Sequence, residues 1–392
     1  MPKVLPYGRH WLDDDDIQAV IEVLRSDWLT TGPKVEAFEQ ALAQTAGTAH
    51  AVAVSSGTAA LHAAMYAIGV GPGDEVIVPA ITFAATANAV VFQQATPVFA
   101  DVDAGTLLLN PASAAAKITT RTKAIVAVDY AGQPCDYDGL REIANRHHLW
   151  LVADGCHSLG AKYRGRSSGS LADLTTFSFH PVKHITTGEG GAVTTDDPEL
   201  AQRMRIFRNH GITTDHRQRD GNGTWYYEMV VLGYNYRISD FQCALGTSQL
   251  RKLPQWLRRR RELAGRYGRE FARVAGISPL CVSPEVEHAY HLYVVRIDSD
   301  RFGCDRNLLF RKLREQGIGV NVHYIPVHLH PYYRQRFGLG AGMCPVAEAA
   351  YSQILSLPLF PQIRDEDVEK VVIAIAAAGR TAGPSRAKAH SG

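Results

Sequence analysis

Between about residues 50 and 200, short apolar runs of strand-like composition alternate with stretches of helical character. Parallel strands need crossover connections, which are usually helices, so this alternation leaves few folds open. Continuously apolar strands are typical of a sheet that is buried on both faces. We therefore predict an α/β fold with a largely parallel sheet and helices on both of its faces. The predicted strands are His50–Val54, Glu75–Val78, Thr96–Phe99, Ala124–Val128, Trp150–Ala153, Leu174–Phe179 and Gly191–Thr195.

The segments on either side of this region differ from it in character. Residues 1–30 combine an extended lead with an amphipathic helix, and the acidic run Asp13–Asp16 suits the positive end of the dipole of that helix. We predict an N-terminal arm and large domain in residues 1–250, a smaller α+β domain in 251–380, and a disordered tail in 381–392. The elements expected in the smaller domain and leading into it are a helix over Leu250–Ala275, strands Tyr290–Ile297 and Gly319–His323, and helices Asn307–Gln316 and Asp365–Ala378.

Composition argues against several classes of protein. With 41 Lys and Arg against 39 Asp and Glu, the net charge is only +2, which argues against a nucleic-acid or membrane-surface partner. No apolar run is long enough to span a bilayer. The six cysteines contain no CxxC pair, so no metal site is indicated. The chain start lacks the apolar core of a signal peptide, and free thiols suit a reducing compartment, so we expect a cytoplasmic protein.

The chemically most informative segment runs from Ser178 to Lys183 and is followed by the glycine turn Gly188–Gly191. A lysine held ahead of such a turn can form a Schiff base with an aldehyde cofactor. The serine five residues earlier can reach a phosphate on the same cofactor. This pattern predicts an enzyme dependent on pyridoxal phosphate.

Four further signals fit that cofactor, although each has a plainer interpretation. The turn Ser56-Gly57-Thr58 follows a strand and opens a helix, where backbone amides bind phosphate, but such turns also serve close packing. Asp154 ends a strand and could pair with a pyridine nitrogen, or could cap the following segment. Phe83 could stack on the ring or belong to the core. His157 could contact the phenolic oxygen of the cofactor or be a structural histidine.

Taken together and in this order, these motifs make the chain resemble the DegT/DnrJ/EryC/StrS sugar-nucleotide aminotransferases, a group of fold-type-I pyridoxal-phosphate enzymes. The resemblance runs from Tyr7 to about Pro361. It rests on the motifs Ser56–Leu61, Asp154–His157, Ser178–Lys183, Gly188–Gly191 and Gly233–Asp240.

The resemblance implies a role for each matching position. Lys183 carries the cofactor and then shuttles protons, and Asp154 pairs with the pyridine nitrogen. His157, at a position often held by glutamine, contacts the ring oxygen, and Phe83 stacks on the ring. Asn235 reaches the phosphate from the other subunit, which implies a homodimer with shared active sites. The remaining cofactor contacts are Ser56, Gly57, Thr58 and Ser178, the last three at the phosphate.

A closer resemblance is to the branch that aminates C4 in pseudaminic acid biosynthesis. It rests on Tyr7, Asp27–Thr30, Trp225–Met229 and Val322–Val327. The implied reaction transfers an amino group from L-glutamate to a UDP-linked 4-keto-6-deoxy-N-acetylhexosamine and gives UDP-4-amino-4,6-dideoxy-N-acetyl-β-L-altrosamine. The residues implied at the sugar nucleotide are Tyr7, Trp28, Leu29, Thr30, Ser56, Tyr324, Ile325, Pro326 and Val327.

Other functions stay open at this point. The main alternative is an aminotransferase for another keto sugar linked to UDP or dTDP. A pyridoxal-phosphate sugar dehydratase is a weaker alternative, because such enzymes typically lack the lysine present here as Lys183. A regulator would need a DNA-binding module, for which the N-terminal part has neither the length nor the basic character.

Overall fold

The computed structural model describes residues 4–214 and 216–380, so the predicted tail at 381–392 lies outside the described residues. Its largest element is a seven-stranded sheet, in which every neighbouring pair is parallel except the two pairs that involve β9. The predicted α/β fold with a largely parallel sheet is confirmed, and each predicted strand ends within two residues of an observed one. In spatial order the strands are β1 (His50–Val54), β9 (Gly191–Thr195), β8 (Leu174–Ser178), β5 (Trp150–Asp154), β4 (Thr122–Val128), β2 (Glu75–Pro79) and β3 (Thr96–Ala100).

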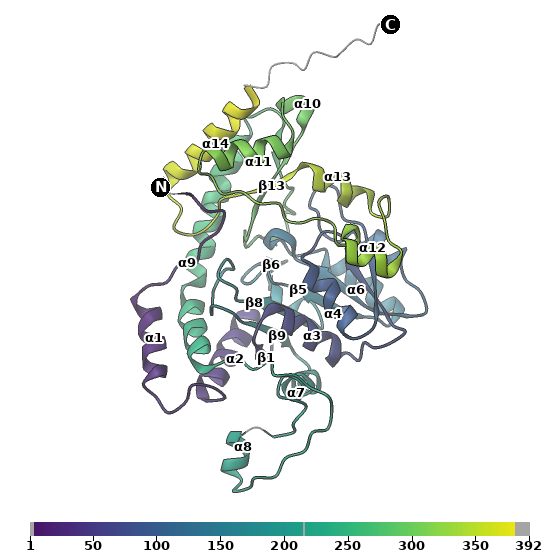
Figure 1. Cartoon of the computed structure of the whole chain (residues 1–392), viewed down its shortest axis with the longest axis vertical. Helices are drawn as coiled ribbons and strands as arrows, with labels where there is room; N and C mark the ends of the chain where they lie inside the picture. The colour runs from purple at the N-terminus through teal and green to yellow at the C-terminus, as the bar shows by residue number, and fades with distance from the viewer. Residues whose placement is uncertain (1–3, 215, 381–392) are drawn as a thin grey trace.

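Helices cover both faces of this sheet (Figure 1). Successive side chains of a strand point to opposite faces. In β1, Val52 and Val54 join the apolar cluster that includes α3, α4 and α6. Ala51 and Ala53 join a second cluster, formed with α2 and α9. The helices of this region are α2 (Pro33–Ala46), α3 (Gly57–Ala67), α4 (Ala84–Phe92), α5 (Pro111–Ala115), α6 (Tyr137–His147), α7 (Pro198–Phe207) and α9 (Asp240–Phe271).

Helix α1 (Asp14–Leu24) packs against α9. Asp13 caps α1 and forms a capping box with Asp16, in agreement with the predicted acidic start.

The predicted bounds of α9 were wrong. This helix begins at Asp240 rather than Leu250, because Ser239 and Gln242 form a capping box there, and it ends at Phe271. The predicted domain boundary at residue 250 stays a prediction, since α9 runs through it without interruption.

The C-terminal part has its own apolar cluster, which joins the second half of α9 to a three-stranded antiparallel sheet. The predicted strand at 290–297 and the two predicted helices correspond to β12, α11 and α14. The sheet contains β10 (Ile277–Pro279), β12 (Tyr293–Ile297) and β13 (Ile354–Leu357), and the helices are α10 (Ser299–Phe302), α11 (Arg306–Glu315), α12 (Pro331–Phe337), α13 (Pro345–Gln353) and α14 (Asp365–Arg380).

The predicted strand Gly319–His323 was wrong. Its backbone hydrogen bonds are divided between two partners, so no ladder forms. Gly319 donates its N–H to the carbonyl of Leu5 (2.7 Å), whereas Asn321 exchanges hydrogen bonds with Ser356 (3.2 and 2.8 Å). A Cβ atom at Gly319 would lie 2.9 Å from the Leu5 carbonyl oxygen, which shows how closely the N-terminal lead crosses this segment.

Shorter elements complete the description. Helix α8 (His216–Gly221) projects from the body of the molecule (Figure 1). A small sheet contains β11 (Val286–Glu287), β6 (Lys162–Tyr163) and β7 (Arg166–Ser167), and 3₁₀ turns span Tyr130–Gly132, Ser168–Ser170 and Val327–Leu329. Among the described residues, no helix combines the length and the apolar character that crossing a membrane requires.

We predict that Phe38→Ala lowers the free energy of unfolding by about 3–5 kcal/mol. The Phe38 ring is fully buried and packs edge-on against Phe179, next to the strand that leads to Ser178. Chemical denaturation measures the loss. Ile373→Ala, at a side chain that is 66% exposed, is the control and should change stability by no more than about 0.5 kcal/mol. Equal unfolding midpoints for the two variants would contradict the assigned packing.

Candidate active site

A cavity of about 550 Å³ opens at the carboxyl ends of β4, β5 and β8. Strand ends at this edge are where α/β folds usually bind ligands. The structure brings together most of the residues predicted for the cofactor and part of those predicted for the sugar nucleotide. Those that line the cavity are Tyr7, Ser56, Gly57, Thr58, Phe83, Asp154, His157, Ser178, Lys183 and Tyr324.

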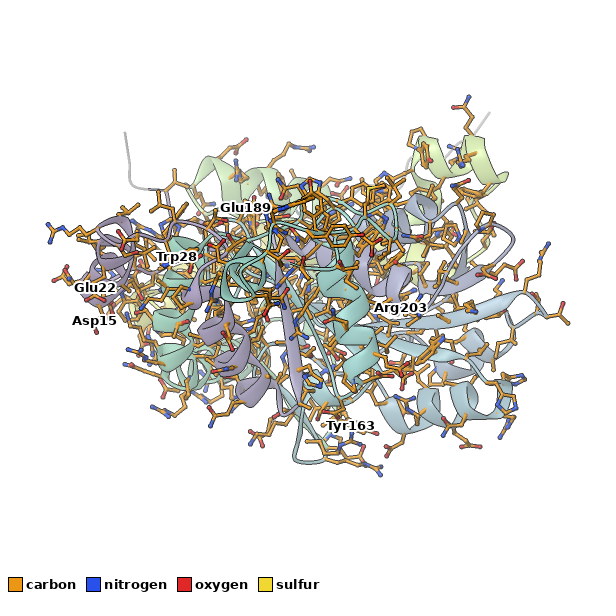
Figure 2. The ribbon with its side chains drawn as sticks, turned by 90° about the horizontal axis from the view of Figure 1, so that it is seen from below. Asp15, Glu22, Trp28, Tyr163, Glu189 and Arg203 are labelled. Carbon is orange, nitrogen blue, oxygen red and sulfur yellow. The ribbon has the colours of Figure 1, made fainter. Side chains whose placement is uncertain are left out.

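The other predicted residues do not line this cavity. Trp28 and Leu29 are exposed, and Trp28 lies toward the α1 side of the molecule, near Asp15 and Glu22 in the view of Figure 2. Thr30 forms a bridge with Ser239. Their roles in binding stay predictions. Four predicted residues remain. Asn235 forms a β-bridge with Asn209, Ile325 is exposed, and Pro326 and Val327 are buried.

Lys183 projects from the connection between β8 and β9. Its backbone N–H donates to the His180 carbonyl (2.9 Å), and Thr187 donates to the Phe179 carbonyl (3.0 Å), so the connection folds back onto the end of β8. Burial lowers the pKa of the Lys183 amine, although the Cys156 thiol and the Asp154 carboxylate oppose this shift. A lowered pKa increases the fraction of neutral amine, which is the form that acts as a nucleophile or a base.

Asp154 is the last residue of β5, and its carboxylate is buried. It accepts hydrogen bonds from the Thr86 hydroxyl (2.7 Å) and the Cys156 backbone N–H (3.2 Å), and Thr86 is in turn hydrogen-bonded to Thr82 (2.7 Å). Among the described residues no Lys, Arg or His forms an ion pair with it. A buried carboxylate without a cation is costly, so the site is suited to a cationic ligand atom such as a protonated pyridine nitrogen.

The N-terminus of α3 faces the same cavity. Ser56 caps this helix, and its hydroxyl accepts the N–H of Ala59 (3.1 Å). Gly57 and Thr58 occupy the first two positions of the helix, whose N–H groups have no partner within the helix. A Cβ atom at Gly57 would lie 2.8 Å from the Cβ of Ser178, so glycine is needed for the two turns to pack together. This arrangement can bind a phosphate.

His157 and His291 lie against each other in the wall of the cavity, with ring centroids 4.3 Å apart. Burial, the charge of Lys183 and the neighbouring histidines lower the pKa of both imidazoles well below the ordinary value, so both are neutral near pH 7. His157 Nε2 lies 3.1 Å from the Tyr324 hydroxyl. The Nδ1 atoms of both histidines are buried and have no hydrogen-bond partner among the described residues.

Phe83 stands at the mouth of the cavity, with 61% of its surface exposed, and its ring is tilted against that of Tyr324 at 5.9 Å. The core interpretation of Phe83 is therefore wrong. The interpretation of Asp154 as a helix N-cap is also wrong, because turns, and no helix, follow it directly at residues 156–160.

The residues present fit pyridoxal phosphate. A lysine amine, a buried carboxylate without a cation, an unpartnered imidazole nitrogen and a helix N-terminus surround one cavity. Sequence reasoning assigned no role to Thr86, His291, Asn321 or His323, which also line the cavity or support its carboxylate. His323 lies in the segment Val322–Val327 that carried the branch resemblance, whereas Thr86, His291 and Asn321 reach the site only through the folding of distant segments.

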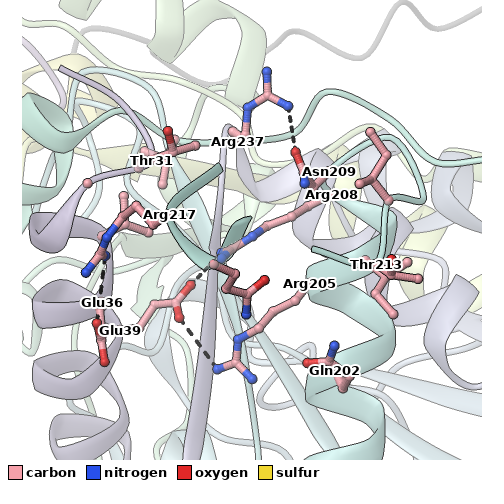
Figure 3. A pocket seen from close by; sticks show the side chains of 16 residues that line it. Thr31, Glu36, Glu39, Gln202, Arg205, Arg208, Asn209, Thr213, Arg217 and Arg237 are labelled. Atoms are coloured by element: carbon pink, nitrogen blue, oxygen red, sulfur yellow. Dashed lines mark hydrogen bonds and ion pairs between the residues drawn. The ribbon is translucent and has the colours of Figure 1, made fainter. Parts of the chain in front are cut away.

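A second cavity, of about 530 Å³, lies between α2 and α7 (Figure 3). Its charged groups largely satisfy one another. Arg208 and Arg205 pair with Glu39, the latter at 3.5 Å, and Arg237 donates to the Asn209 side chain (2.8 Å). None of the predicted cofactor residues lines it.

Known proteins are similar to this chain over nearly its whole length. The model of the DegT/DnrJ/EryC1/StrS aminotransferase family matches residues 11–376. The spore coat polysaccharide biosynthesis protein SpsC of Bacillus subtilis (strain 168) is 44% identical over 373 residues, which cover 95% of this chain and 96% of that protein.

Two solved structures are similar over nearly the whole chain. The putative sugar aminotransferase Spr1654 from Streptococcus pneumoniae has been solved in PMP and PLP forms. Its PMP form superposes with a TM-score of 0.91 at 34% identity and covers 96% of this chain and 99% of that one. PseC of Helicobacter pylori, an aminotransferase involved in pseudaminic acid biosynthesis, has a TM-score of 0.90 at 33% identity and covers 97% and 100%.

We predict that His323 makes the folded protein sensitive to acid. Burial and the charge of Lys183 lower the pKa of His323 to about 4, from 6.5 in an unfolded chain. Between these values the unfolded chain binds a proton that the native protein does not, so the free energy of unfolding falls with falling pH, by up to about 3 kcal/mol at this site.

Denaturation of His323→Asn between pH 7 and pH 4 tests this. The variant should lose less stability on acidification than the wild type. His180→Asn, at an exposed histidine that lines the same cavity, is the control and should follow the wild type. Parallel curves for wild type and His323→Asn would show the prediction to be wrong.

Proposed function

Because the chain belongs to the DegT/DnrJ/EryC1/StrS aminotransferase family, we propose that it transfers the amino group of L-glutamate to C4 of a UDP-linked 4-keto-6-deoxy-N-acetylhexosamine. The family, the enzyme class and the pyridoxal phosphate cofactor predicted from the sequence are confirmed, since the family is one of aminotransferases and the similar sugar aminotransferase Spr1654 has been solved in PLP and PMP forms. The acceptor sugar, the UDP group, the amino donor and the cytoplasmic location belong to the proposal.

The observation that carries the proposal is the meeting of Lys183 and Asp154 in one cavity. The two residues come from different strand ends and carry groups of opposite charge. Within the part of the chain that the structure describes, they do not form an ion pair with each other. A cofactor with an aldehyde on one side and a ring nitrogen on the other can engage both.

When bound, pyridoxal phosphate supplies a ring that accepts the electrons left behind when a proton leaves the carbon next to the nitrogen. Asp154 holds the positive charge of the ring nitrogen, and Thr86 and Cys156 hold the carboxylate in place. The N-terminus of α3 and Ser178 bind the phosphate. Phe83 covers one side of the cavity.

Lys183 moves the protons of the reaction. Its amine, with a lowered pKa, takes the proton from the α-carbon of glutamate in the first half of the cycle. In the second half, the same nitrogen delivers a proton to C4 of the sugar, the carbon that carries the new amine.

Support for the acceptor comes from PseC, whose role in pseudaminic acid biosynthesis matches the branch resemblance of Tyr7 and the segment 322–327. A second candidate has support of its own. SpsC, at 44% identity, is named for spore coat polysaccharide biosynthesis, which favours a different nucleotide-linked keto sugar as the acceptor.

The proposal also includes a homodimer. Asn235 does not line the cavity of its own chain but forms a bridge with Asn209. Near it, the segment 225–234 exposes several large apolar side chains, among them Trp225 at 83% and Leu232 at 77%. We propose that this segment contacts a second copy and delivers Asn235 to the phosphate of the partner site.

We predict that the wild type, mixed with pyridoxal phosphate, shows the visible absorption of a lysine-bound cofactor, and that borohydride followed by peptide mapping places the label on Lys183. Lys183→Ala should show neither signal. Glutamate should bleach the band and a UDP-linked 4-keto sugar should restore it. Lys162→Ala, at a surface lysine paired with Glu287 (3.3 Å), is the matched control.

Two outcomes would separate the parts of this proposal. A label at another lysine, or none, would overturn the assignment of Lys183. Bleaching by glutamate without recovery on addition of the UDP sugar, but with recovery on a dTDP-linked keto sugar, would replace the acceptor and keep the aminotransferase.

We predict that inactive Lys183→Ala and Asn235→Ala chains regain activity when they are mixed. If Asn235 acts across the dimer, each heterodimer contains one intact site, and random exchange restores about a quarter of the wild-type sites. Activity after exchange measures this, with differently tagged subunits as proof of exchange. Complete exchange without recovered activity would refute the shared site.

A further inference from the structure

The hydrogen bond between Tyr324 and His157 joins a half-buried tyrosine to a buried histidine from a distant part of the chain. The Tyr324 hydroxyl lies 3.1 Å from His157 Nε2. The other ring nitrogen of His157, Nδ1, is buried and has no hydrogen-bond partner among the described residues. A neutral imidazole carries one proton, so the direction of the Tyr324 hydrogen bond decides whether Nδ1 is a donor or an acceptor.

The contacts favour Tyr324 as the donor. If His157 donated from Nε2, two groups would lack partners within the described chain: the hydroxyl proton of Tyr324 and the lone pair of Nδ1. If Tyr324 donates, the single unmatched group is the Nδ1–H of His157. Buried donors without acceptors are costly, so the second arrangement is preferred, and a ligand can satisfy its one free donor.

The surroundings keep both partners in the required state. Tyr324 packs between the rings of Phe83 and Tyr130, at 5.9 and 6.4 Å, and burial raises the pKa of its hydroxyl well above the ordinary value, so it stays protonated. The His291 ring, 4.3 Å from that of His157, limits rotation of the imidazole.

We propose that Tyr324 sets the tautomer of His157, so that Nδ1–H is the donor offered to the anionic ring oxygen of the bound cofactor. This rests on the proposed function for the identity of the ligand, but the tautomer itself is a property of the cofactor-free protein. Tyr324 is then a positioning residue that acts through His157, in addition to the sugar-nucleotide role predicted from the sequence.

The tautomer can be measured without cofactor or substrate. Nitrogen NMR of the protein labelled at histidine, with the His157 signal assigned from its loss in His157→Gln, should show the wild type protonated at Nδ1. Tyr324→Phe should shift His157 toward the Nε2–H form. Tyr267→Phe, which removes a buried hydroxyl bonded to the Pro358 carbonyl (3.0 Å), is the matched control and should leave the signal unchanged. A wild-type signal from the Nε2–H form would overturn the proposal, whatever the state of Tyr324→Phe.

A double-mutant cycle on cofactor affinity tests the consequence. Tyr324→Phe should weaken binding of pyridoxal phosphate, measured without sugar, by about five- to tenfold, the value of one hydrogen bond. A glutamine at position 157 carries an amide N–H whatever its neighbour does, so Tyr324→Phe should have little effect in the His157→Gln background. Equal effects in both backgrounds would overturn the coupling. If wild type formed no lysine-bound cofactor at all, the proposed function would fail instead, and the NMR result would still decide the tautomer.

Discussion

The parallel pairing of β5 with β8 is the contact on which the active site depends. Asp154 at the end of β5 stands opposite Thr176, two residues before Ser178 at the end of β8. Both strands therefore end at the same edge of the sheet. Strand β9 returns antiparallel to β8, and the connection between them carries Lys183 over that edge. Because successive side chains alternate between faces, a slip of one residue would turn the Asp154 carboxylate to the other side.

Burial, more than ion pairing, sets the electrostatics of the site. The Asp154 carboxylate is held by neutral donors, the imidazoles of His157 and His291 are kept uncharged, and burial lowers the pKa of the Lys183 amine. Such groups are incompletely partnered in the protein by itself. In a site of low dielectric constant, a ligand that supplies the missing partners gains more from each hydrogen bond than it would in water.

The extent to which the sequence predicts these features varies with the kind of signal. The strands and the Ser56–Thr58 turn were recognisable, because apolar runs and glycine turns are local properties. The bounds of α9 were missed, since the capping box of Ser239 and Gln242 lies upstream of the charged stretch that marked the helix. The segment at 319–323 has strand-like composition, but its backbone bonds are shared between Leu5 and Ser356, which no local pattern reveals.

By itself the sequence determined the fold class and marked Lys183 and Asp154 as candidates for the site, because strands and the turn that carries the lysine are encoded in contiguous residues. The tertiary structure decided which other groups complete the site. Thr86, His291 and Tyr324 reach Asp154 and His157 from helices and loops far away in the chain. Their roles depend on how the helices and strands pack. The number of residues that separates two positions in the sequence does not tell whether packing will bring them into contact.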